Sequence, residues 1–166
     1  RLMADDHEAT LATLTSHREI FVRYVGQHQG RVVNAPGDAI LAEFGSVVDA
    51  VACSAEIQRE LAEKNAELPD HRKMEFRIGV NLGDVLVKDN DLFGDGVNIA
   101  ARLQALADPS GICISGTAFD QVENRLPLEY ASLGEQQVKN IPKPVRAYKV
   151  LSRPGASSRG RPIGRQ

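Results

Sequence analysis

The stretch FRIGVNLGDVLVKDNDLFGDGVNIAARL, residues 76–103, decides how this chain is expected to fold. Apolar and polar residues alternate, break at 81–83 and alternate again up to residue 91, which predicts a β-hairpin. Two glycines then form a corner, and the alanine-rich run after them predicts a helix from about residue 96 to 107. Asn98 and Arg102 lie four residues apart and therefore on one face of that helix. An amide beside a guanidinium suits an anionic or hydroxylated ligand, although a lone helical arginine is more often a solvated surface residue.

Helical and extended patterns alternate on both sides of this stretch. The apolar face of the first helix is expected to include Phe21, Val22 and Val25, and Ser46 is expected to cap the second helix. The order of elements predicts an α+β fold, with a mostly antiparallel sheet and helices over one face. The chain opens on a helix, where such sheets usually begin with a strand. Further helices are expected within residues 5–30, 46–68 and 117–126, and strands within 31–44, 111–115 and 128–151.

Composition points to a globular domain followed by a tail. The 166 residues are 42% hydrophobic and 25% charged, with a net charge of -2, which suits one domain with a sizeable core. This balance argues against a nucleic acid as a partner. Residues 1–151 are expected to form the domain. Residues 152–166 are rich in Arg, Gly, Pro and Ser and are expected to form a flexible basic tail or linker.

The two cysteines and the lengths of the apolar segments indicate where in the cell the chain is expected to lie. Cys53 and Cys113 lie within apolar patterns and are expected to be small core residues rather than a disulfide framework, so a reducing, cytoplasmic location is expected. Since no apolar run approaches the roughly 20 residues needed to cross a bilayer, no membrane segment is expected in this chain.

Asp38 lies in a Pro-Gly-Asp turn between two short apolar strands. Aspartate is common in turns because its side chain bonds to the nearby backbone, and that is the ordinary explanation for this residue. A turn carboxylate can also hold Mg²⁺, which usually takes one or two protein carboxylates beside substrate phosphates. On its own, Asp38 is therefore half of a metal site at most.

Taken together, three segments resemble one known family. They are VVNAPGDAILAEF (residues 32–44), the stretch of residues 76–103, and LGEQQVKNIPKPVRAYKV (residues 133–150). In this order they resemble the class III nucleotidyl cyclase catalytic domain of the bacterial adenylate/guanylate cyclase type, over residues 2–150. The GVN-x-A-x-RL pattern is specific in this context, whereas the Gly-Asp turn alone is not.

The resemblance implies a fold, a reaction and an assembly. The fold is a ferredoxin-like βαββαβ core with additional strands and helices. The reaction converts ATP into 3',5'-cyclic AMP and pyrophosphate by a two-metal mechanism, with two Mg²⁺ or Mn²⁺ ions in each site. The active sites lie between the two subunits of a homodimer.

The resemblance also implies roles for individual residues. Asp38 matches a metal ligand, and Asn98 matches the asparagine that orients the ribose. Arg102 matches the arginine that stabilises the transition state. Lys139 matches the lysine that binds the triphosphate.

Base recognition is implied at two further positions. Asp91 matches the residue that reads the purine, where an acid can accept from the adenine amino group and so favours ATP. Asn34 stands where family adenylate cyclases often carry a lysine and guanylate cyclases an acid. Because its amide both donates and accepts, Asn34 leaves GTP open as the alternative substrate.

The chain departs from the family pattern at its start. RLMADDHEATL, residues 1–11, resembles the segment that comes after the family's first strand and phosphate loop, so the other metal aspartate is expected before Arg1. Asp5 and Asp6 are not substitutes, because acids at a helix start complement the helix dipole. This chain alone is therefore expected to be impaired as an enzyme.

Two alternatives remain open from sequence. A cyclase-homology domain without activity, serving as a dimerising or nucleotide-sensing module, is favoured by the departure at the chain start and by Asn34. A ferredoxin-like RNA-binding domain is disfavoured by the acidic charge balance and the 5% aromatic content.

Overall fold

The computed structural model describes residues 7–33, 40–83, 86–89 and 91–151, so the 152–166 segment and the predicted site residues Asn34 and Asp38 lie outside the described residues. The described helices are α2 (His7–Gln27), α3 (Val47–Ala66), α4 (Asp95–Leu106) and α5 (Gly116–Val122), together with the 3-10 turn η1 (Asp70–Arg72). The strands are β1 (Gly30–Val33), β2 (Leu41–Phe44), β3 (Ile78–Val80), β4 (Leu86–Lys88), β5 (Asp91–Phe93), β6 (Ile112–Ser115), β7 (Tyr130–Gln136) and β8 (Val145–Val150).

The predicted α+β class is confirmed. Four strands form the central sheet in the order β3-β6-β8-β7, while β1 pairs with β2 and β4 pairs with β5 in separate two-stranded ribbons. Among the described strands only β3 and β6 run parallel, so the pairing is mostly antiparallel, as expected.

The predicted hairpin that turns at 81–83 is wrong. Strand β3 instead pairs with β6, with Ile78 opposite Ile112, and β4 pairs with β5, with Lys88 opposite Asp91. The alternating pattern is compatible with both arrangements because it reports which residues face a core but does not identify the partner strand. The strand β6 is buried at every position, and it supplies β3 with a partner inside the molecule.

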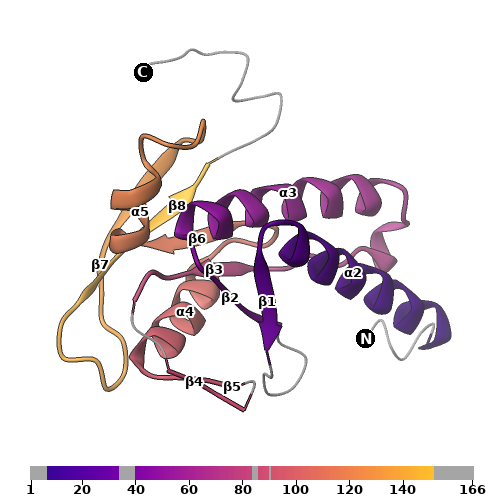
Figure 1. Cartoon of the computed structure of the whole chain (residues 1–166). Coiled ribbons are helices and arrows are strands. Elements are labelled where there is room, and N and C mark those ends of the chain that lie inside the picture. The colour runs from indigo at the N-terminus through magenta and orange to yellow at the C-terminus, as the bar shows by residue number, and fades with distance from the viewer. Residues whose placement is uncertain (1–6, 34–39, 84–85, 90, 152–166) are drawn as a thin grey trace.

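Helices cover both faces of the central sheet, so the expectation of helices over one face only is also wrong (Figure 1). Strand β6 shows why, since its side chains alternate between two cores. Ile112 and Ile114 pack with residues of α3 and α5, whereas Cys113 packs with Leu103 of α4 on the opposite face. Cys53 and Cys113 are buried free thiols, which confirms both as core residues.

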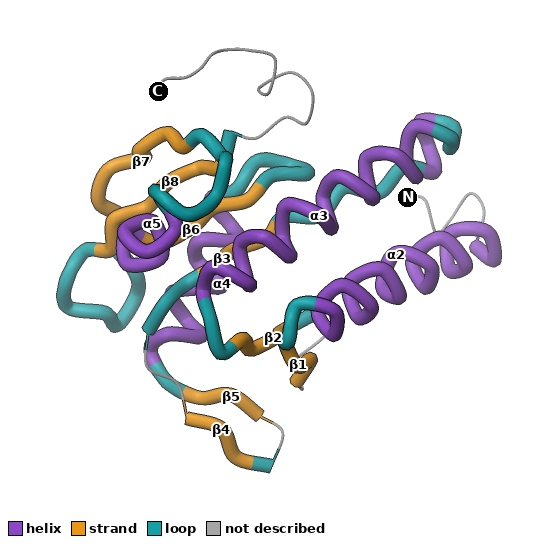
Figure 2. The backbone as a smooth tube through the Cα atoms, turned by 45° about the horizontal axis from the view of Figure 1, so that its top comes forward, coloured by secondary structure: helices purple, strands orange, loops and turns teal. Residues whose placement is uncertain are grey.

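Helix α2 lies against α3, away from β7 (Figure 2). Its buried face carries Ile20, Phe21 and Val25, but Val22 is 47% exposed, which corrects the predicted face. His17 takes the place on that face where the helical pattern predicts an apolar residue, and it is only 1% exposed. The helical period explains the difference, because positions 17, 20, 21 and 25 share one face and position 22 turns away from it.

Helix α3 is anchored at both ends. The Ser46 side chain accepts a hydrogen bond from the backbone N–H of Asp49, which confirms the predicted cap. Near the other end, buried Asn65 makes two hydrogen bonds with the backbone of Met74, one to its carbonyl and one from its N–H.

Of the helices described, none has the length and apolar character to cross a membrane.

Candidate active site on helix α4

A sharp corner joins β5 to α4, between the predicted site residues Asp91 and Asn98. Gly94 has φ 119° and ψ 172°, a conformation that glycine adopts without the steric cost other residues would meet. No side chain caps the helix at this point. Asp91 therefore begins the strand on one arm of the corner, and Asn98 lies in the first turns of the helix on the other.

The inner face of α4 is packed tightly on the sheet. Leu103 is 1% exposed and clusters with Ala107, Cys113 and Ala147. A Cβ on Gly79 of β3 would lie 2.4 Å from both the carbonyl oxygen of Ala100 and the amide nitrogen of Gln104. The absence of a side chain at position 79 thus lets the helix backbone rest directly on the strand, and this fixes the height of α4 above the sheet.

Asn98 and Arg102 lie on the outer face of α4. Both side chains are exposed, together with the small residues Ala101 and Ala105 of the same face. Their i,i+4 spacing places the two Cβ atoms about 5–6 Å apart. Neither side chain makes a hydrogen bond or ion pair with another residue in the described part of the chain. The structure therefore presents an unengaged amide and an unengaged guanidinium side by side, as the sequence predicted.

Lys139 and Asp91 lie on other elements. Lys139 is exposed in the connection between β7 and β8, and in both ribbon views this connection lies beside α4 (Figures 1 and 2). Asp91 is half-buried, and its side chain has no hydrogen-bond or ion-pair partner among the described residues. The structure thus places four of the six predicted site residues on β5, α4 and the β7–β8 connection, and their predicted roles stay predictions.

The predicted metal ligand Asp38 lies in the segment between β1 and β2 that is outside the described residues. Within the described ranges, no three His, Cys, Asp or Glu side chains gather closely enough to hold a metal ion. The fit of a divalent metal therefore depends on residues beyond those described.

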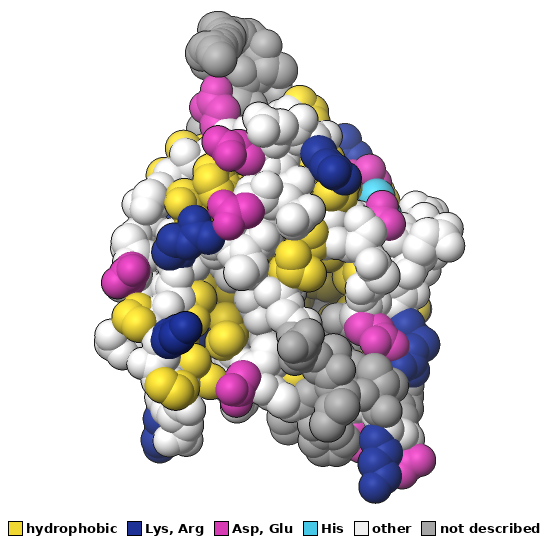
Figure 3. All heavy atoms as spheres, turned by 60° about the vertical axis from the view of Figure 1, so that its left-hand side comes forward, with side chains coloured by type: hydrophobic (Ala, Val, Ile, Leu, Met, Phe, Trp, Pro, Cys, Tyr) yellow, Lys and Arg dark blue, Asp and Glu magenta, His cyan; other side chains and the backbone are white. Residues whose placement is uncertain are grey.

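Charges of both signs are mixed on the molecular face that Figure 3 shows. Basic side chains are separated there by acidic and hydrophobic ones.

Of the thiols, Cys113 lies directly beneath α4, and burial raises its pKa to about 11. At neutral pH this sulfur stays protonated, so it serves packing rather than nucleophilic chemistry.

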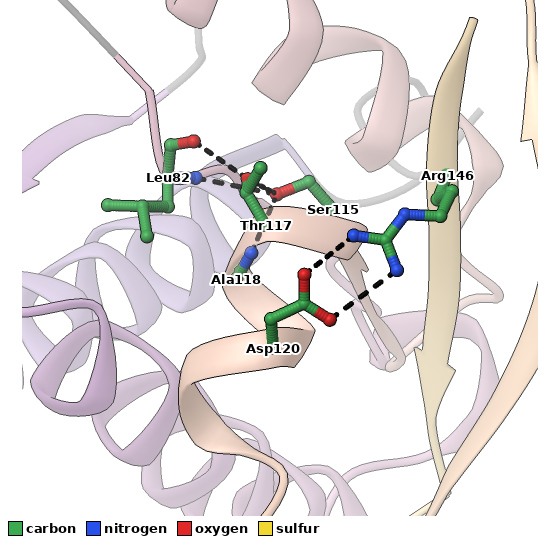
Figure 4. Close-up of polar contacts among 6 residues, drawn as sticks. All are labelled: Leu82, Ser115, Thr117, Ala118, Asp120 and Arg146. Atoms are coloured by element: carbon green, nitrogen blue, oxygen red, sulfur yellow. Dashed lines mark hydrogen bonds and ion pairs between the residues drawn. The ribbon is translucent and has the colours of Figure 1, made fainter.

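Sequence reasoning missed a set of polar contacts that hold the turn before β4. Asn81 donates from Nδ2 to the carbonyl oxygen of Gly96, at 3.3 Å, in the first turn of α4. Ser115 and Thr117, at the start of α5, bond to both backbone polar groups of Leu82 (Figure 4). No periodicity could have found these contacts, because they join residues 15 to 35 positions apart in the sequence.

Comparisons with known proteins agree on one family. The model of the adenylate and guanylate cyclase catalytic domain matches residues 2–152. A Rhizobium meliloti protein named "Putative adenylate cyclase 3" is 46% identical over 149 residues, which cover 89% of this chain. The chain spans 25% of the length of that curated relative.

Solved structures show the same likeness. The adenylate/guanylate cyclase/hydrolase of Silicibacter pomeroyi superimposes with a TM-score of 0.77 at 36% identity, covering 81% of this chain and 80% of that one. The adenylyl cyclase CyaB of P. aeruginosa shares the fold, with a TM-score of 0.70 at 19% identity, over 88% of this chain and 84% of its own.

Proposed function

The chain belongs to the adenylate and guanylate cyclase catalytic domain family, and on that premise we propose that it is the catalytic domain of an adenylate cyclase. It would convert ATP into 3',5'-cyclic AMP and pyrophosphate. The observation that carries this proposal is the pair of exposed side chains of Asn98 and Arg102, which have no partner among the described residues and lie on a helix packed tightly against the sheet.

The reaction needs charge stabilisation more than covalent chemistry from the protein. The ribose 3'-oxygen loses its proton and forms a bond to the α-phosphorus, while the bond from that phosphorus to the leaving pyrophosphate breaks. Arg102 suits the charge that develops on the α-phosphate, because its planar guanidinium donates in a fixed fork. Asn98, one helical turn away, is placed to hold the ribose so that its 3'-oxygen faces the phosphorus.

Asp91 and Lys139 would bind the two ends of the nucleotide. The carboxylate oxygens of Asp91 can accept from the adenine amino group, which favours ATP over GTP. The exposed ammonium of Lys139 suits the triphosphate. Asn34 can donate or accept, so GTP remains the alternative substrate.

We place the reaction at the interface of a homodimer. The outer face of α4 has no protein partner for Asn98 and Arg102 among the described residues of its own chain, and the small Ala101 and Ala105 beside them let a second surface come close. Asp38 of one subunit and Arg102 of the other would then serve the same substrate. Bound Mg²⁺ or Mn²⁺ would neutralise triphosphate charge, with Asp38 as the ligand this chain contributes.

Mixing two inactive variants tests this arrangement in the full-length protein. Arg102→Ala and Asp38→Ala should each lack activity as homodimers. A mixed dimer contains one site with both residues intact, so an equal, freely exchanging mixture should recover about a quarter of the wild-type rate. Recovery with this pair, but none when Arg102→Ala is mixed with Asn98→Ala, supports sites shared between subunits. Full activity of either single variant contradicts the assignment.

A further inference from the structure

We propose that Asn81 and Thr117 are positioning residues that fix the first turn of α4, and so set where Asn98 meets the substrate. This inference rests on the proposed function. It concerns the turn at residues 81–83, between β3 and β4, which is held from two sides by side chains distant in sequence.

The first contact runs from this turn to α4. Helix α4 begins without a capping side chain at its N-terminal N–H groups. Asn81 contacts the first turn at a different group, because its Nδ2 donates to the carbonyl oxygen of Gly96, a buried residue. This bond does not replace a cap, but it ties the backbone of the first turn to residue 81. Asn98 follows Gly96 by two residues, so a shift of the Gly96 carbonyl moves the Asn98 backbone with it.

The second contact holds Leu82 through a ring of hydroxyl groups (Figure 4). The Leu82 N–H donates to Ser115 Oγ at 3.4 Å, and Thr117 Oγ1 donates to the Leu82 carbonyl at 2.8 Å. The two hydroxyls lie 2.9 Å apart. Since Thr117 has only one hydroxyl hydrogen and gives it to Leu82, Ser115 must donate to Thr117. Both backbone groups of Leu82 are thus satisfied by side chains, in a closed ring.

The start of α5 is itself immobilised, so Thr117 holds Leu82 rather than following it. Ser115 is 1% exposed, and its Oγ also accepts from the N–H of Ala118. Arg146 of β8 forms a two-pronged ion pair with Asp120 of α5, with its Nη2 2.7 Å from Oδ2. The Arg146 side chain crosses directly over Gly116, where a Cβ would lie 2.5 Å from Cζ. The central sheet therefore fixes α5, and α5 fixes Leu82.

Together these contacts form a chain of support from β8 through α5 and the turn to the first turn of α4. Thr117 is exposed, so its hydroxyl can be removed without opening a core cavity. Thr117→Val keeps the shape and loses the donor, whereas Thr117→Ser keeps the hydroxyl. Asn81→Asp is nearly isosteric and also loses a donor. These three variants separate positioning from packing.

The test measures kcat and KM for ATP in the full-length protein, at a temperature where circular dichroism shows every variant folded. Loss of one hydrogen bond corresponds to roughly a five- to tenfold fall in kcat for Thr117→Val and for Asn81→Asp, with KM within about twofold. Thr117→Ser should stay near the wild type. The double variant should fall little further than either single variant, because both act on one turn. Ser132→Ala, which removes a hydroxyl that bonds within β7, is the matched control and should keep wild-type kcat.

Hydrogen exchange gives a readout that does not need activity. Peptides from α4 should exchange faster in Thr117→Val than in Thr117→Ser, while peptides from α3 should exchange equally in both. If the wild type makes cyclic nucleotide and the valine and serine variants share its kcat, the inference is overturned and the proposed function stands. If the wild type forms no product, the proposed function has failed, and exchange alone then decides the support of α4. Equal exchange of α4 peptides in Thr117→Val and Thr117→Ser overturns the claim that Thr117 supports α4. Faster exchange in Thr117→Val than in Thr117→Ser supports that claim.

Discussion

Replacing Gly79 by alanine should separate the position of α4 from the chemistry of its side chains. The new Cβ would lie 2.4 Å from two backbone atoms of α4, while ordinary contact begins at 3.4 Å. These atoms belong to a helix backbone and cannot rotate away, so α4 must retreat from β3 by about 1 Å. Such overpacking typically costs about 1–3 kcal/mol. For a protein of this size the unfolding midpoint should then fall by about 2–12 °C.

The effect on turnover should exceed the effect on stability. A misplacement of about 1 Å in a positioned catalytic group can cost roughly 100-fold in rate. We therefore expect Gly79→Ala to lower kcat by about that factor, with a smaller change in KM, because Asp91 and Lys139 lie on other elements. The assay is steady-state cyclic AMP formation beside thermal unfolding followed by circular dichroism.

Gly45→Ala is the matched control. Gly45 lies between β2 and α3, and no atom lies within 4 Å of its added Cβ, so both stability and turnover should stay near the wild type. If Gly79→Ala folds with lowered stability but keeps full kcat, the height of α4 does not govern catalysis. If Gly79→Ala loses neither stability nor turnover, the backbone of α4 does not lie as close to β3 as described.

Three single side chains give further tests. Arg102→Ala should lower kcat by about 100- to 1000-fold with a smaller effect on KM, and near-normal turnover in steady-state kinetics would remove Arg102 from the mechanism. Burial lowers the pKa of His17 below its ordinary 6.5, so the unfolded chain binds a proton that the folded chain does not. The free energy of unfolding should therefore fall as pH drops below about 6.5, by at most about 1.4 kcal/mol per pH unit from this group. Urea unfolding at pH 7 and pH 5 measures this fall. The fall should be lost in His17→Leu and kept in the control His71→Leu, which changes an exposed histidine. Asn65→Ala leaves the part-buried backbone of Met74 without its two partners and should cost about 1–3 kcal/mol in the same measurement. A loss smaller than about 0.5 kcal/mol would show that water replaces the amide.

Periodicity in the sequence predicts the elements but not all of their neighbours. The Ser46 cap, the buried strand β6 and the β7–β8 pair follow from local signals, and the structure confirms them. The partner of β3 does not, because parallel pairing with β6 joins residues more than 30 positions apart and leaves the same alternating pattern as a hairpin would. His17 was missed for a related reason, since a helical period marks a face as buried without requiring every residue on it to be apolar.

The candidate site, too, could be predicted from the sequence only in part. Asn98 and Arg102 could be placed together from their spacing alone, and the structure confirms that both are exposed on one helix. What holds that helix could not be predicted. In the sequence alone, Gly79 is a glycine that weakens a strand, and Asn81 is a residue common in turns. The structure shows that Gly79 lies against the backbone of α4 and that Asn81 donates to the Gly96 carbonyl in its first turn.

The product that the full-length protein makes from each triphosphate is the decisive measurement for the proposed cyclase activity. With Mn²⁺ present, we predict cyclic AMP from ATP at a higher rate than cyclic GMP from GTP. Both rates should fall to background when the metal is chelated. Cyclic GMP as the faster product would overturn the role assigned to Asp91, and no product from either triphosphate would contradict the enzymatic function as a whole.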